Sequence, residues 1–333
     1  MMIEADLNID TFARLIMRDT FEILIIDEVH PVLLDQLAEH SVKYLPQITL
    51  DELPVELATA QILIMRSKLH LSREWIEQAP ELRVIGRLGS GMDNIEIEYA
   101  EAKGVYCVNA PEGNRNAVAE QTIGMMLSML SNVHQSMRQV RSRIWDRKGN
   151  QGLELKNLTV GIIGYGNVGS RLGELLSVFG CKVLAYDLFI SGFGNSSVEE
   201  CSLEKIQTEA DIVSLHVPLN MHSKKMVNAA FIDKMKKPFF LLNLARGSVV
   251  NISDIISGLE SEKIKGVALD VLPNEKLSTL TEKEEVSFSY LTDNERVMLT
   301  PHIGGLTKDS YEALAKVLSE KVLKWIKMNT LIN

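Results

Sequence analysis

The 333-residue sequence has little cysteine, no long apolar run and no block of basic residues. Its three cysteines, Cys107, Cys181 and Cys201, are too few and too scattered for a disulfide framework or a zinc site. No apolar stretch reaches the length of a membrane span, and no N-terminal signal peptide is visible. We therefore expect a cytoplasmic protein with no membrane partner and no bound metal.

The charge balance excludes another class of partner. The formal net charge is −9, and basic residues do not cluster anywhere in the chain. Nucleic-acid-binding proteins usually carry a basic patch, so we expect no nucleic-acid partner. The length is sufficient for two domains with separate cores.

The stretch 158–187 carries the strongest pattern in the chain. A short apolar run, typical of a strand buried on both faces, leads into three glycines with G-x-G-x-x-G spacing. An amphipathic helical pattern and a second apolar run follow, and the stretch ends in an acid. A lone G-x-G-x-x-G is a weak signal, but here strand, helix, second strand and acid are all in place. The pattern predicts a dinucleotide-binding βαβ unit rather than a Gly-rich surface turn.

Each glycine of such a unit, and the acid at its end, has a physical role. Gly164 permits a tight turn, Gly166 lets the backbone approach a pyrophosphate, and Gly169 lets the helix pack on the strand. The helix N-terminus offers N–H groups and partial positive charge to the phosphates. Asp187 is placed to accept hydrogen bonds from a ribose diol and would repel a 2′-phosphate. The sequence thus predicts NAD, not NADP, as the cofactor.

Strand and helix patterns alternate on both sides of this stretch. Such alternation predicts an α/β fold of parallel sheets covered by helices on both faces. Ser72 is the predicted N-cap of one helix, and Trp145, in a polar irregular segment at 142–152, is expected to be anchored against one domain. Residues 1–20 form an N-terminal extension with no recognisable motif. Before residue 110 the predicted strands are 21–26, 42–44, 61–65, 83–86 and 104–108, and the predicted helices are 31–39, 72–78 and 95–102. Long helices are predicted over 114–134 and 311–328.

Polar or charged residues follow the predicted strands of the second half, which are 211–217, 239–244, 266–270 and 297–300. The carboxyl edge of a parallel sheet is where ligands bind. Arg246 has the forked, permanent charge that holds a carboxylate, and His302 can exchange a proton near neutral pH. Glu275 can orient that imidazole and stabilise its protonated form. Together with a nicotinamide cofactor, these residue types suggest hydride transfer.

Seven motifs in order resemble those of the D-isomer-specific 2-hydroxyacid dehydrogenase family. They are GRLGSGMDNIE at 86–96, NAPEGNRNAVAEQTIGMML at 109–127, LTVGIIGYGNVG at 158–169, LHVPL at 215–219, NLARGSVV at 243–250, ALDVLPNE at 268–275 and TPHIGG at 300–305. The resemblance implies a Rossmann NAD-binding domain, 116–305, inserted into a flavodoxin-like catalytic domain, 21–115 plus 306–333. It also implies a homodimer formed through the NAD-binding domain, with the long helix after residue 114 at the interface.

The resemblance also implies roles for individual residues. Arg246 would bind and polarise the substrate, His302 would be the general acid/base, and Glu275 would support it. Further substrate contacts would come from Ser67, Leu88, Gly89, Ser90 and Gly91, and the place of Arg66 and Lys68 after a strand adds these two residues to the predicted substrate site. Cofactor contacts would come from Gly164, Tyr165, Gly166, Asn167, Val168, Gly169, Asp187, His216, Val217, Pro218, Ser223, Leu244, Ala245, Arg246, Asp270, His302 and Gly304. Lys276 stands where the family often has proline, and the charged segment 276–296 is long, so the loop after Glu275 departs from the family pattern.

The substrate is less well defined by the residues. The chain is similar to the short 3-phosphoglycerate dehydrogenases, which act in serine biosynthesis, and we expect no appended regulatory domain after the last helix. Arg66 and Lys68 follow a strand and suit a phosphate, but exposed basic residues are also common. Glyoxylate/hydroxypyruvate reductase and D-lactate dehydrogenase are the alternative activities. An NAD-sensing, corepressor-like binding protein is the alternative of another class.

Overall fold

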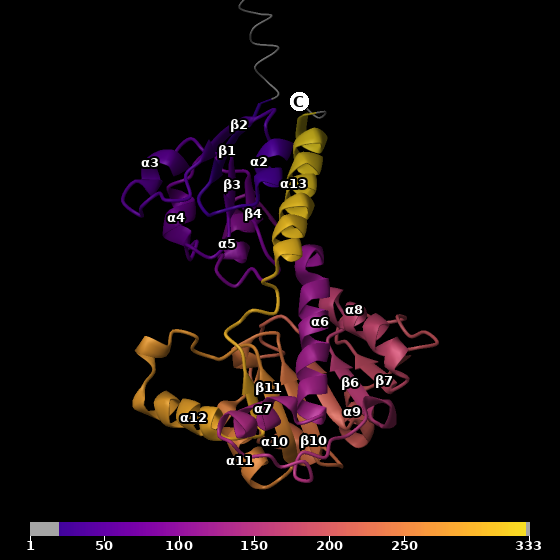
Figure 1. Ribbon diagram of the computed structural model, residues 1–333. Helices are drawn as coiled ribbons and strands as arrows, with labels where there is room; N and C mark the ends of the chain where they lie inside the picture. The colour runs from indigo at the N-terminus through magenta and orange to yellow at the C-terminus, as the bar shows by residue number, and fades with distance from the viewer. Residues whose placement is uncertain (1–19, 331–333) are drawn as a thin grey trace, which may run out of the picture. The chain divides into compact units, whose positions relative to one another are not determined.

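The computed structural model describes residues 20–330, so the predicted N-terminal extension lies outside the described residues except for its last one. The described chain forms two compact units (Figure 1). Unit 1 holds the residues up to Asn114 and those from Lys308 onward, and unit 2 is Arg115–Thr307. The division into two compact units does not show what each unit binds. The predicted catalytic domain, 21–115 plus 306–333, and the predicted NAD-binding domain, 116–305, therefore stay predictions.

Unit 1 is built on a five-stranded parallel sheet with the strand order β2-β1-β3-β4-β5. This is the flavodoxin-like order that the family resemblance implies. The central strand β3 is buried at every residue, which explains why its sequence, ILIM, shows no polar alternation. The strands are β1 (Glu22–Ile25), β2 (Ser41–Tyr44), β3 (Ile62–Met65), β4 (Val84–Arg87) and β5 (Tyr106–Asn109).

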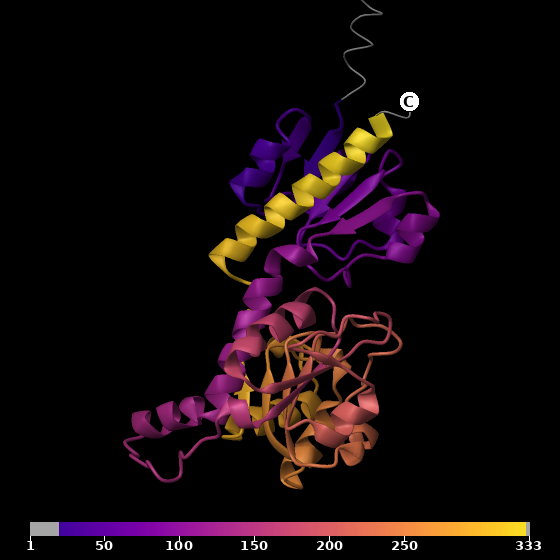
Figure 2. The same ribbon diagram turned by 90° about the vertical axis from the view of Figure 1, so that its right-hand side faces the viewer.

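A long C-terminal helix, α13 (Lys308–Thr330), crosses one face of this sheet (Figure 2). Its residues Leu314, Leu318 and Val322 share a core cluster with the strands. A Cβ on Gly86 would lie 3.4 Å from the side chain of Leu318, so the helix approaches β4 closely. The C-terminal segment thus completes the core of the unit in which the described chain begins. The other helices are α2 (Pro31–Gln36), α3 (Leu53–Leu57), α4 (Arg73–Glu77) and α5 (Ile97–Ala102).

Unit 2 contains a seven-stranded parallel sheet with the order β12-β11-β10-β9-β6-β7-β8. From β6 the chain builds outward to β8, then returns to the other side of β6 and builds outward to β12. This is the Rossmann arrangement, and its topological switch point lies between β6 and β9. The strands are β6 (Thr159–Ile163), β7 (Lys182–Tyr186), β8 (Glu199–Glu200), β9 (Ile212–Leu215), β10 (Phe239–Asn243), β11 (Ile264–Leu269) and β12 (Val297–Leu299).

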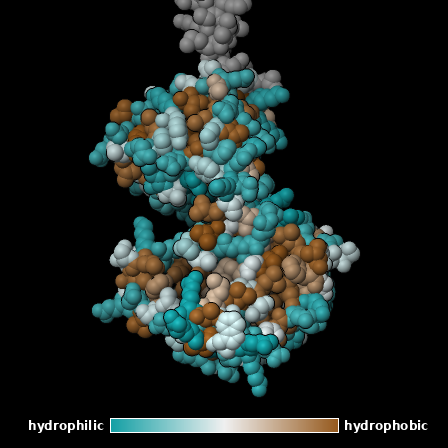
Figure 3. Space-filling model, in the orientation of Figure 1, coloured by the Kyte–Doolittle hydropathy of each residue, from teal (hydrophilic) through white to brown (hydrophobic). Residues whose placement is uncertain are grey.

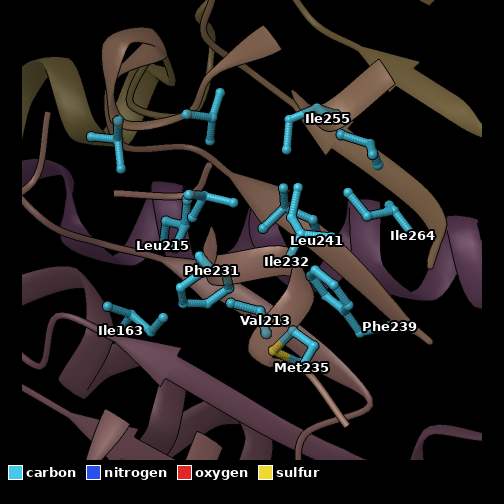
Figure 4. Close-up of a cluster of buried hydrophobic side chains, with 14 of the residues drawn as sticks. Ile163, Val213, Leu215, Phe231, Ile232, Met235, Phe239, Leu241, Ile255 and Ile264 are labelled. Atoms are coloured by element: carbon cyan, nitrogen blue, oxygen red, sulfur yellow. The ribbon is translucent and has the colours of Figure 1, made fainter. Parts of the chain in front are cut away.

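Helices cover both faces of the second sheet, with a separate hydrophobic cluster on each side. In one cluster, Val213 and Leu215 of β9 pack with Phe231 and Phe239 (Figure 4). The helix α6 (Pro111–Leu130) begins in unit 1 and supplies buried residues to the other cluster. The remaining helices are α7 (Val133–Arg141), α8 (Asn167–Leu176), α9 (Leu203–Glu209), α10 (Ala229–Lys234), α11 (Ile252–Glu260) and α12 (Glu282–Asp293), with short 3-10 turns at Leu155–Asn157, Ser177–Phe179, Gly247–Val249 and Leu277–Thr279.

Two expectations about the segment before β6 are wrong. The predicted helix 114–134 is two helices, because Asn132 has a left-handed φ of 52° between α6 and α7. Trp145 is not anchored against unit 2, because its side chain is 79% exposed in the isolated chain. The polar residues around Trp145 indicate an irregular segment, but they do not indicate in which direction the indole ring points. In residues 20–330, none of the helices has the length and apolar character of a membrane span.

Candidate active site

The Gly-rich turn connects β6 to α8 with the geometry that a dinucleotide site requires. Gly164 has a φ of +93°, and a Cβ there would lie 2.5 Å from the carbonyl oxygen of His216. A Cβ on Gly169 would lie 2.0 Å from the carbonyl oxygen of Gly164, so the helix could not sit this close to the turn with a side chain there. A Cβ on Gly166 would instead point into open space. The turn therefore fits a pyrophosphate approaching Gly166 at the N-terminus of α8.

Asp187 follows β7 and joins the turn to the next loop. Its Oδ2 accepts a hydrogen bond from the Tyr165 N–H at 2.7 Å, and Oδ1 accepts from the Phe189 and Ile190 N–H groups at 2.8 and 3.0 Å. A carboxylate offers about four acceptor positions, so it retains capacity for a ribose hydroxyl. Asp187 thus orients the predicted ribose site as well as contributing to it.

The loop after β9 holds four predicted cofactor residues, of which Ser223 is buried, His216 and Val217 are half-buried and Pro218 is exposed. Burial lowers the pKa of His216 to about 4, so the imidazole is neutral at physiological pH. Its Nε2 lies 2.8 Å from the Ser214 hydroxyl, and its carbonyl faces Gly164. Ser223 Oγ donates to the carbonyl of Pro218 at 2.5 Å. Val217 packs against the core, and these contacts fix the loop beside the Gly-rich turn.

Arg246 lies in a turn after β10 that a buried amide shapes. The side chain of Asn243, fully buried, accepts from the Ala245 N–H at 3.1 Å and donates to the Arg246 carbonyl at 2.9 Å. Leu244 and Ala245 are also buried. Arg246 Nη1 donates to the Ala245 carbonyl at 2.7 Å. Asn243 was not predicted as a site residue, although it opens the NLARGSVV motif.

Glu275 and His302 meet at the same sheet edge. His302 Nδ1 lies 2.9 Å from Glu275 Oε2, and each side chain is about half exposed. Asp270, which follows β11, is buried and accepts from the Ile303 and Gly304 N–H groups at 3.0 and 2.8 Å. The pair is therefore accessible to a small molecule, while the turn that carries the imidazole is bound to the sheet.

The predicted substrate residues form two adjacent loops in unit 1, after the paired strands β3 and β4. Asn94 ties the loops together, because its Nδ2 donates to the carbonyls of Arg66 and Leu69 at 3.1 and 2.9 Å. Leu88 and Gly89 are buried, Ser67 is exposed, and Ser90 and Gly91 are intermediate. The hydroxyl of Ser90 donates to the side chain of Asn114.

The two predicted cations of these loops have neutral partners. The guanidinium of Arg66 lies over the ring of Tyr311, 5.2 Å from its centroid. Lys68 Nζ donates to the carbonyls of Pro46 and Ile48. Neither contact neutralises the positive charge. The structure thus gathers the predicted substrate residues in unit 1 and the predicted cofactor and catalytic residues in unit 2.

The sequence profile of the "D-isomer specific 2-hydroxyacid dehydrogenase, NAD binding domain" matches residues 123–304, more than half of the chain. The chain belongs to the D-isomer-specific 2-hydroxyacid dehydrogenase family. The matched region is the NAD-binding domain of that family, which confirms the predicted fold class, family and cofactor. In the described chain, the side chains of His, Cys, Asp and Glu form no group of three or more that could hold a metal ion.

Individual relatives agree with this membership. D-3-phosphoglycerate dehydrogenase of Methanocaldococcus jannaschii is 32% identical over 309 residues, covering 91% of this chain and 57% of that protein. The same-named protein of Haemophilus influenzae is 34% identical over 275 residues, covering 83% and 66%. D-lactate dehydrogenase from Aquifex aeolicus, solved with NAD and lactic acid, is 26% identical with a TM-score of 0.80, covering 92% of this chain and 95% of that one. This member of the family therefore spans just over half to two thirds of the length of these curated relatives.

Proposed function

We propose that this protein is an NAD-dependent D-2-hydroxyacid dehydrogenase, which transfers a hydride between NAD(H) and a 2-hydroxy or 2-keto acid. The observation that carries the proposal is the 2.9 Å contact between Glu275 and His302 on the sheet that also carries the Gly-rich turn. Arg246 follows β10, which pairs with β11, at the same edge. A dinucleotide turn, a proton donor and a forked cation are the parts that reduction of a 2-keto acid needs.

The imidazole of His302 handles the proton. Bound NADH supplies the hydride that reaches the carbonyl carbon of the substrate. His302 gives its Nε2 proton to the oxygen of that carbonyl, which becomes the hydroxyl group of the product, and the Nδ1 proton stays on the side of Glu275. The carboxylate lies 2.9 Å from Nδ1, so it fixes the orientation and the tautomer of the ring. In the oxidation direction the neutral imidazole takes the hydroxyl proton.

Arg246 holds the substrate and stabilises its developing charge. Its guanidinium can donate two parallel hydrogen bonds to the substrate carboxylate and stays charged throughout the reaction. The same cation stabilises the negative charge that develops on the carbonyl oxygen. Asn243 holds both sides of the turn and so fixes the main chain that carries this cation.

A substrate panel tests the proposed activity. We expect the protein to oxidise NADH steadily with at least one of hydroxypyruvate, 3-phosphohydroxypyruvate, glyoxylate and pyruvate, and to use NADPH less efficiently. Binding of NADH is measured in parallel by fluorescence titration. Tight binding without turnover on any member of the panel would contradict the enzyme and favour an NAD-sensing binding protein.

Within that activity, we infer that the substrate is 3-phosphohydroxypyruvate or its product D-3-phosphoglycerate. Curated relatives carry the name D-3-phosphoglycerate dehydrogenase. Arg66 and Lys68 keep their charge in the described contacts, because an aromatic ring and two carbonyls are neutral partners. A phosphate gains charge-assisted hydrogen bonds from two such cations that a hydroxymethyl group cannot gain.

The double change Arg66→Ala, Lys68→Ala tests this substrate class. It is expected to raise KM for 3-phosphohydroxypyruvate far more than KM for hydroxypyruvate. The matched control is Arg73→Ala, Lys103→Ala, because both of these cations lie over the ring of Tyr99 in the same unit. Equal effects on the KM of both substrates, or the same selectivity change in the control, would contradict a role of Arg66 and Lys68 in phosphate binding.

We further propose a homodimer formed through unit 2. Apolar side chains are exposed on α7 and the segment after it, which project from the body of this unit (Figure 2). Brown patches also interrupt the polar surface of unit 2 in Figure 3. Contiguous exposed apolar surface marks an interface, and a partner would cover the ring of Trp145. The exposed residues of this arm are Val133, Met137, Val140, Ile144, Trp145 and Leu153.

Sedimentation equilibrium tests the dimer. Met137→Asp combined with Ile144→Asp is expected to produce a monomer, because two charges would be desolvated at the interface. Val55→Asp is the matched control, since Val55 is 74% exposed in unit 1. A monomeric wild type, or a dimer that persists with both aspartates, would contradict an interface on this arm.

The compartment follows from the cysteines. Cys107, Cys181 and Cys201 are all free thiols, and burial raises the pKa of Cys107 to about 11. Thiols that remain free are typical of a reducing environment. We therefore infer that the protein works in the cytoplasm.

A further inference from the structure

The carboxylate of Asp270 is the centre of a buried polar cluster that the motif reading did not identify. Its side chain is 1% exposed. Oδ1 accepts from Gln121 Nε2 at 3.0 Å, from the Thr300 hydroxyl at 2.5 Å and from the Ile303 N–H at 3.0 Å. A buried carboxylate is costly unless several donors satisfy it. Gln121 and Thr300 therefore help to keep this charge inside the sheet edge.

The same carboxylate holds the turn that contains His302. The main chain of His302 has a φ of 55°, a left-handed conformation that non-glycine residues adopt uncommonly. Its N–H donates to the Asp270 carbonyl at 2.8 Å, and the two following N–H groups donate to the Asp270 carboxylate. Conformations of this kind persist when surrounding contacts over-determine them. A Cβ on Gly304 would lie 2.9 Å from Asp270 Oδ2, so the turn also packs closely on the carboxylate.

We propose that Gln121 and Thr300 are positioning residues for the reaction, which set the place of the His302 imidazole by fixing Asp270. This inference rests on the proposed function, in which His302 is the acid and base. Gln121 reaches Asp270 from α6, so a helix far away in sequence completes the anchor. Its Nε2 also lies 3.2 Å from Thr300 Oγ1, which links the two donors to each other. Without them the carboxylate keeps its main-chain partners but loses the side chains that hold Oδ1 in place.

Both side chains are half-buried in unit 2 beside Met125, whose sulfur lies 3.8 Å from Gln121 Nε2 and 3.9 Å from Thr300 Oγ1. Removing either donor therefore lowers stability as well, and activity alone does not separate positioning from folding. A positioning role predicts a lower kcat with a nearly constant KM, because substrate binding depends on other residues. It also predicts a larger deuterium isotope effect, since hydride transfer becomes slower relative to the other steps.

The test uses Gln121→Leu and Thr300→Val, with Thr300→Ser as the conservative variant that keeps the hydroxyl. Gln78→Leu and Thr292→Val are matched controls, because both side chains bond to main-chain carbonyls on exposed helices. We measure kcat and KM for the best 2-keto acid, and the isotope effect with NADH carrying deuterium at the transferred position. Amide hydrogen exchange at Ile303 and Gly304 is measured by NMR on the same proteins.

We expect Gln121→Leu and Thr300→Val to lower kcat by about tenfold to a hundredfold, the scale of a misplaced reacting group. The isotope effect should rise, exchange at Ile303 and Gly304 should accelerate, and Thr300→Ser should restore most of the rate. Unchanged kcat and isotope effect in both variants, or an equal loss in Thr300→Ser, would overturn the proposal. Absence of turnover in the wild type would contradict the proposed function instead. In that case, unchanged exchange at Ile303 and Gly304 would contradict the anchoring as well.

Discussion

The two units share one architecture, a parallel sheet between helices, but they differ in the polar side chains buried at the carboxyl ends of their strands. In unit 2, three neighbouring strands carry fully or almost fully buried polar side chains there, Ser214, Asn243 and Asp270. Each bonds to the loop that follows its own strand or a neighbouring one. In the described part of unit 1, the buried polar side chains are Ser310 and Ser319, both on α13.

This difference separates two ways of making a binding edge. Unit 2 holds its loops by buried hydrogen bonds, which fixes charged groups such as Arg246 and His302 on a rigid frame. In unit 1, the loops after β3 and β4 are partly exposed, and Asn94 holds the first of them through the carbonyls of Arg66 and Leu69. We therefore expect matched substitutions in the two units to have unequal effects on stability and on ligand binding.

The first prediction compares two glycines with positive φ. Gly164 of unit 2 and Gly104 of unit 1 have φ values of +93° and +79°, but only at Gly164 would a Cβ meet main-chain atoms within 3 Å. Gly104→Ala is expected to cost about 1–2 kcal/mol of stability from the left-handed backbone alone. Gly164→Ala should cost several times as much and abolish tight NADH binding. Urea unfolding and fluorescence titration of both variants measure this, and equal costs would contradict the close approach.

The second prediction compares two acids that follow strands. Asp187 accepts from the Tyr165 N–H in unit 2, and Asp27 accepts from the Arg66 N–H in unit 1. Asp187→Ala is expected to raise the Kd for NADH by about tenfold, through loss of charge-assisted hydrogen bonds, and to relax discrimination against NADPH. Asp27→Ala should leave the Kd unchanged and raise KM for the keto acid. Isothermal titration and steady-state kinetics separate these outcomes, and NADPH used better than NADH by the wild type would refute the role of Asp187.

The third prediction concerns the stability of the two units at acidic pH. Burial lowers the pKa of His216 from 6.5 to about 4, so below pH 6.5 the unfolded chain binds a proton that the folded unit does not. Stability of unit 2 is therefore full above pH 6.5 and falls as the pH drops toward 4, by roughly 2 kcal/mol between pH 6.5 and 5. Burial also lowers the pKa of His40 in unit 1, but the neighbouring Glu39 opposes this shift, so we expect a smaller loss there.

Hydrogen exchange of β6 and β9 against β3 and β4, corrected for the intrinsic pH dependence, measures this loss in each unit separately. His216→Asn should make unit 2 insensitive over the same range. A parallel loss in both units, or a loss that persists in His216→Asn, would show that another group is responsible.

The smallest predicted effect distinguishes two helix starts. Ser202 caps α9, because its hydroxyl accepts from the Lys205 N–H at 3.3 Å. Ser72 occupies the predicted N-cap of α4, but its hydroxyl donates to the Glu74 carboxylate and makes no cap hydrogen bond. Ser202→Ala is expected to cost about 1 kcal/mol and Ser72→Ala clearly less. Thermal unfolding of the two variants checks the order, and a reversed order would refute the distinction.

The sequence predicts the strands of both sheets except β8, because the other strands contain apolar runs between turn residues, whereas β8 consists of Glu199 and Glu200. The motifs also locate Arg246, Glu275 and His302, since each follows a strand. What the patterns missed depends on tertiary contacts. Gln121 is one polar residue in a helical run, and nothing local indicates that it reaches Asp270. Trp145 is apolar, and its exposure depends on the direction of a projecting arm.

Some missed elements did leave a local signal. Thr281 and Glu284 form a capping box at the start of α12, and the T-x-x-E spacing is visible in the charged segment 276–296. The charge of that segment does not by itself predict the helix. The contacts of Lys68 had no such signal, because two carbonyls of a loop about twenty residues earlier accept its hydrogen bonds.

In the proposed reaction, His302 transfers the proton at the edge of unit 2 with the support of Glu275. The most direct test of this role is stopped-flow reduction of a 2-keto acid by NADH in the wild type, His302→Ala and Glu275→Gln, with NADH binding measured alongside. We predict that His302→Ala lowers kcat by about a hundredfold or more, the scale of a positioned general acid, that Glu275→Gln has a smaller effect in the same direction, and that both variants bind NADH like the wild type. Unchanged turnover in His302→Ala would contradict the role of His302 as the proton donor.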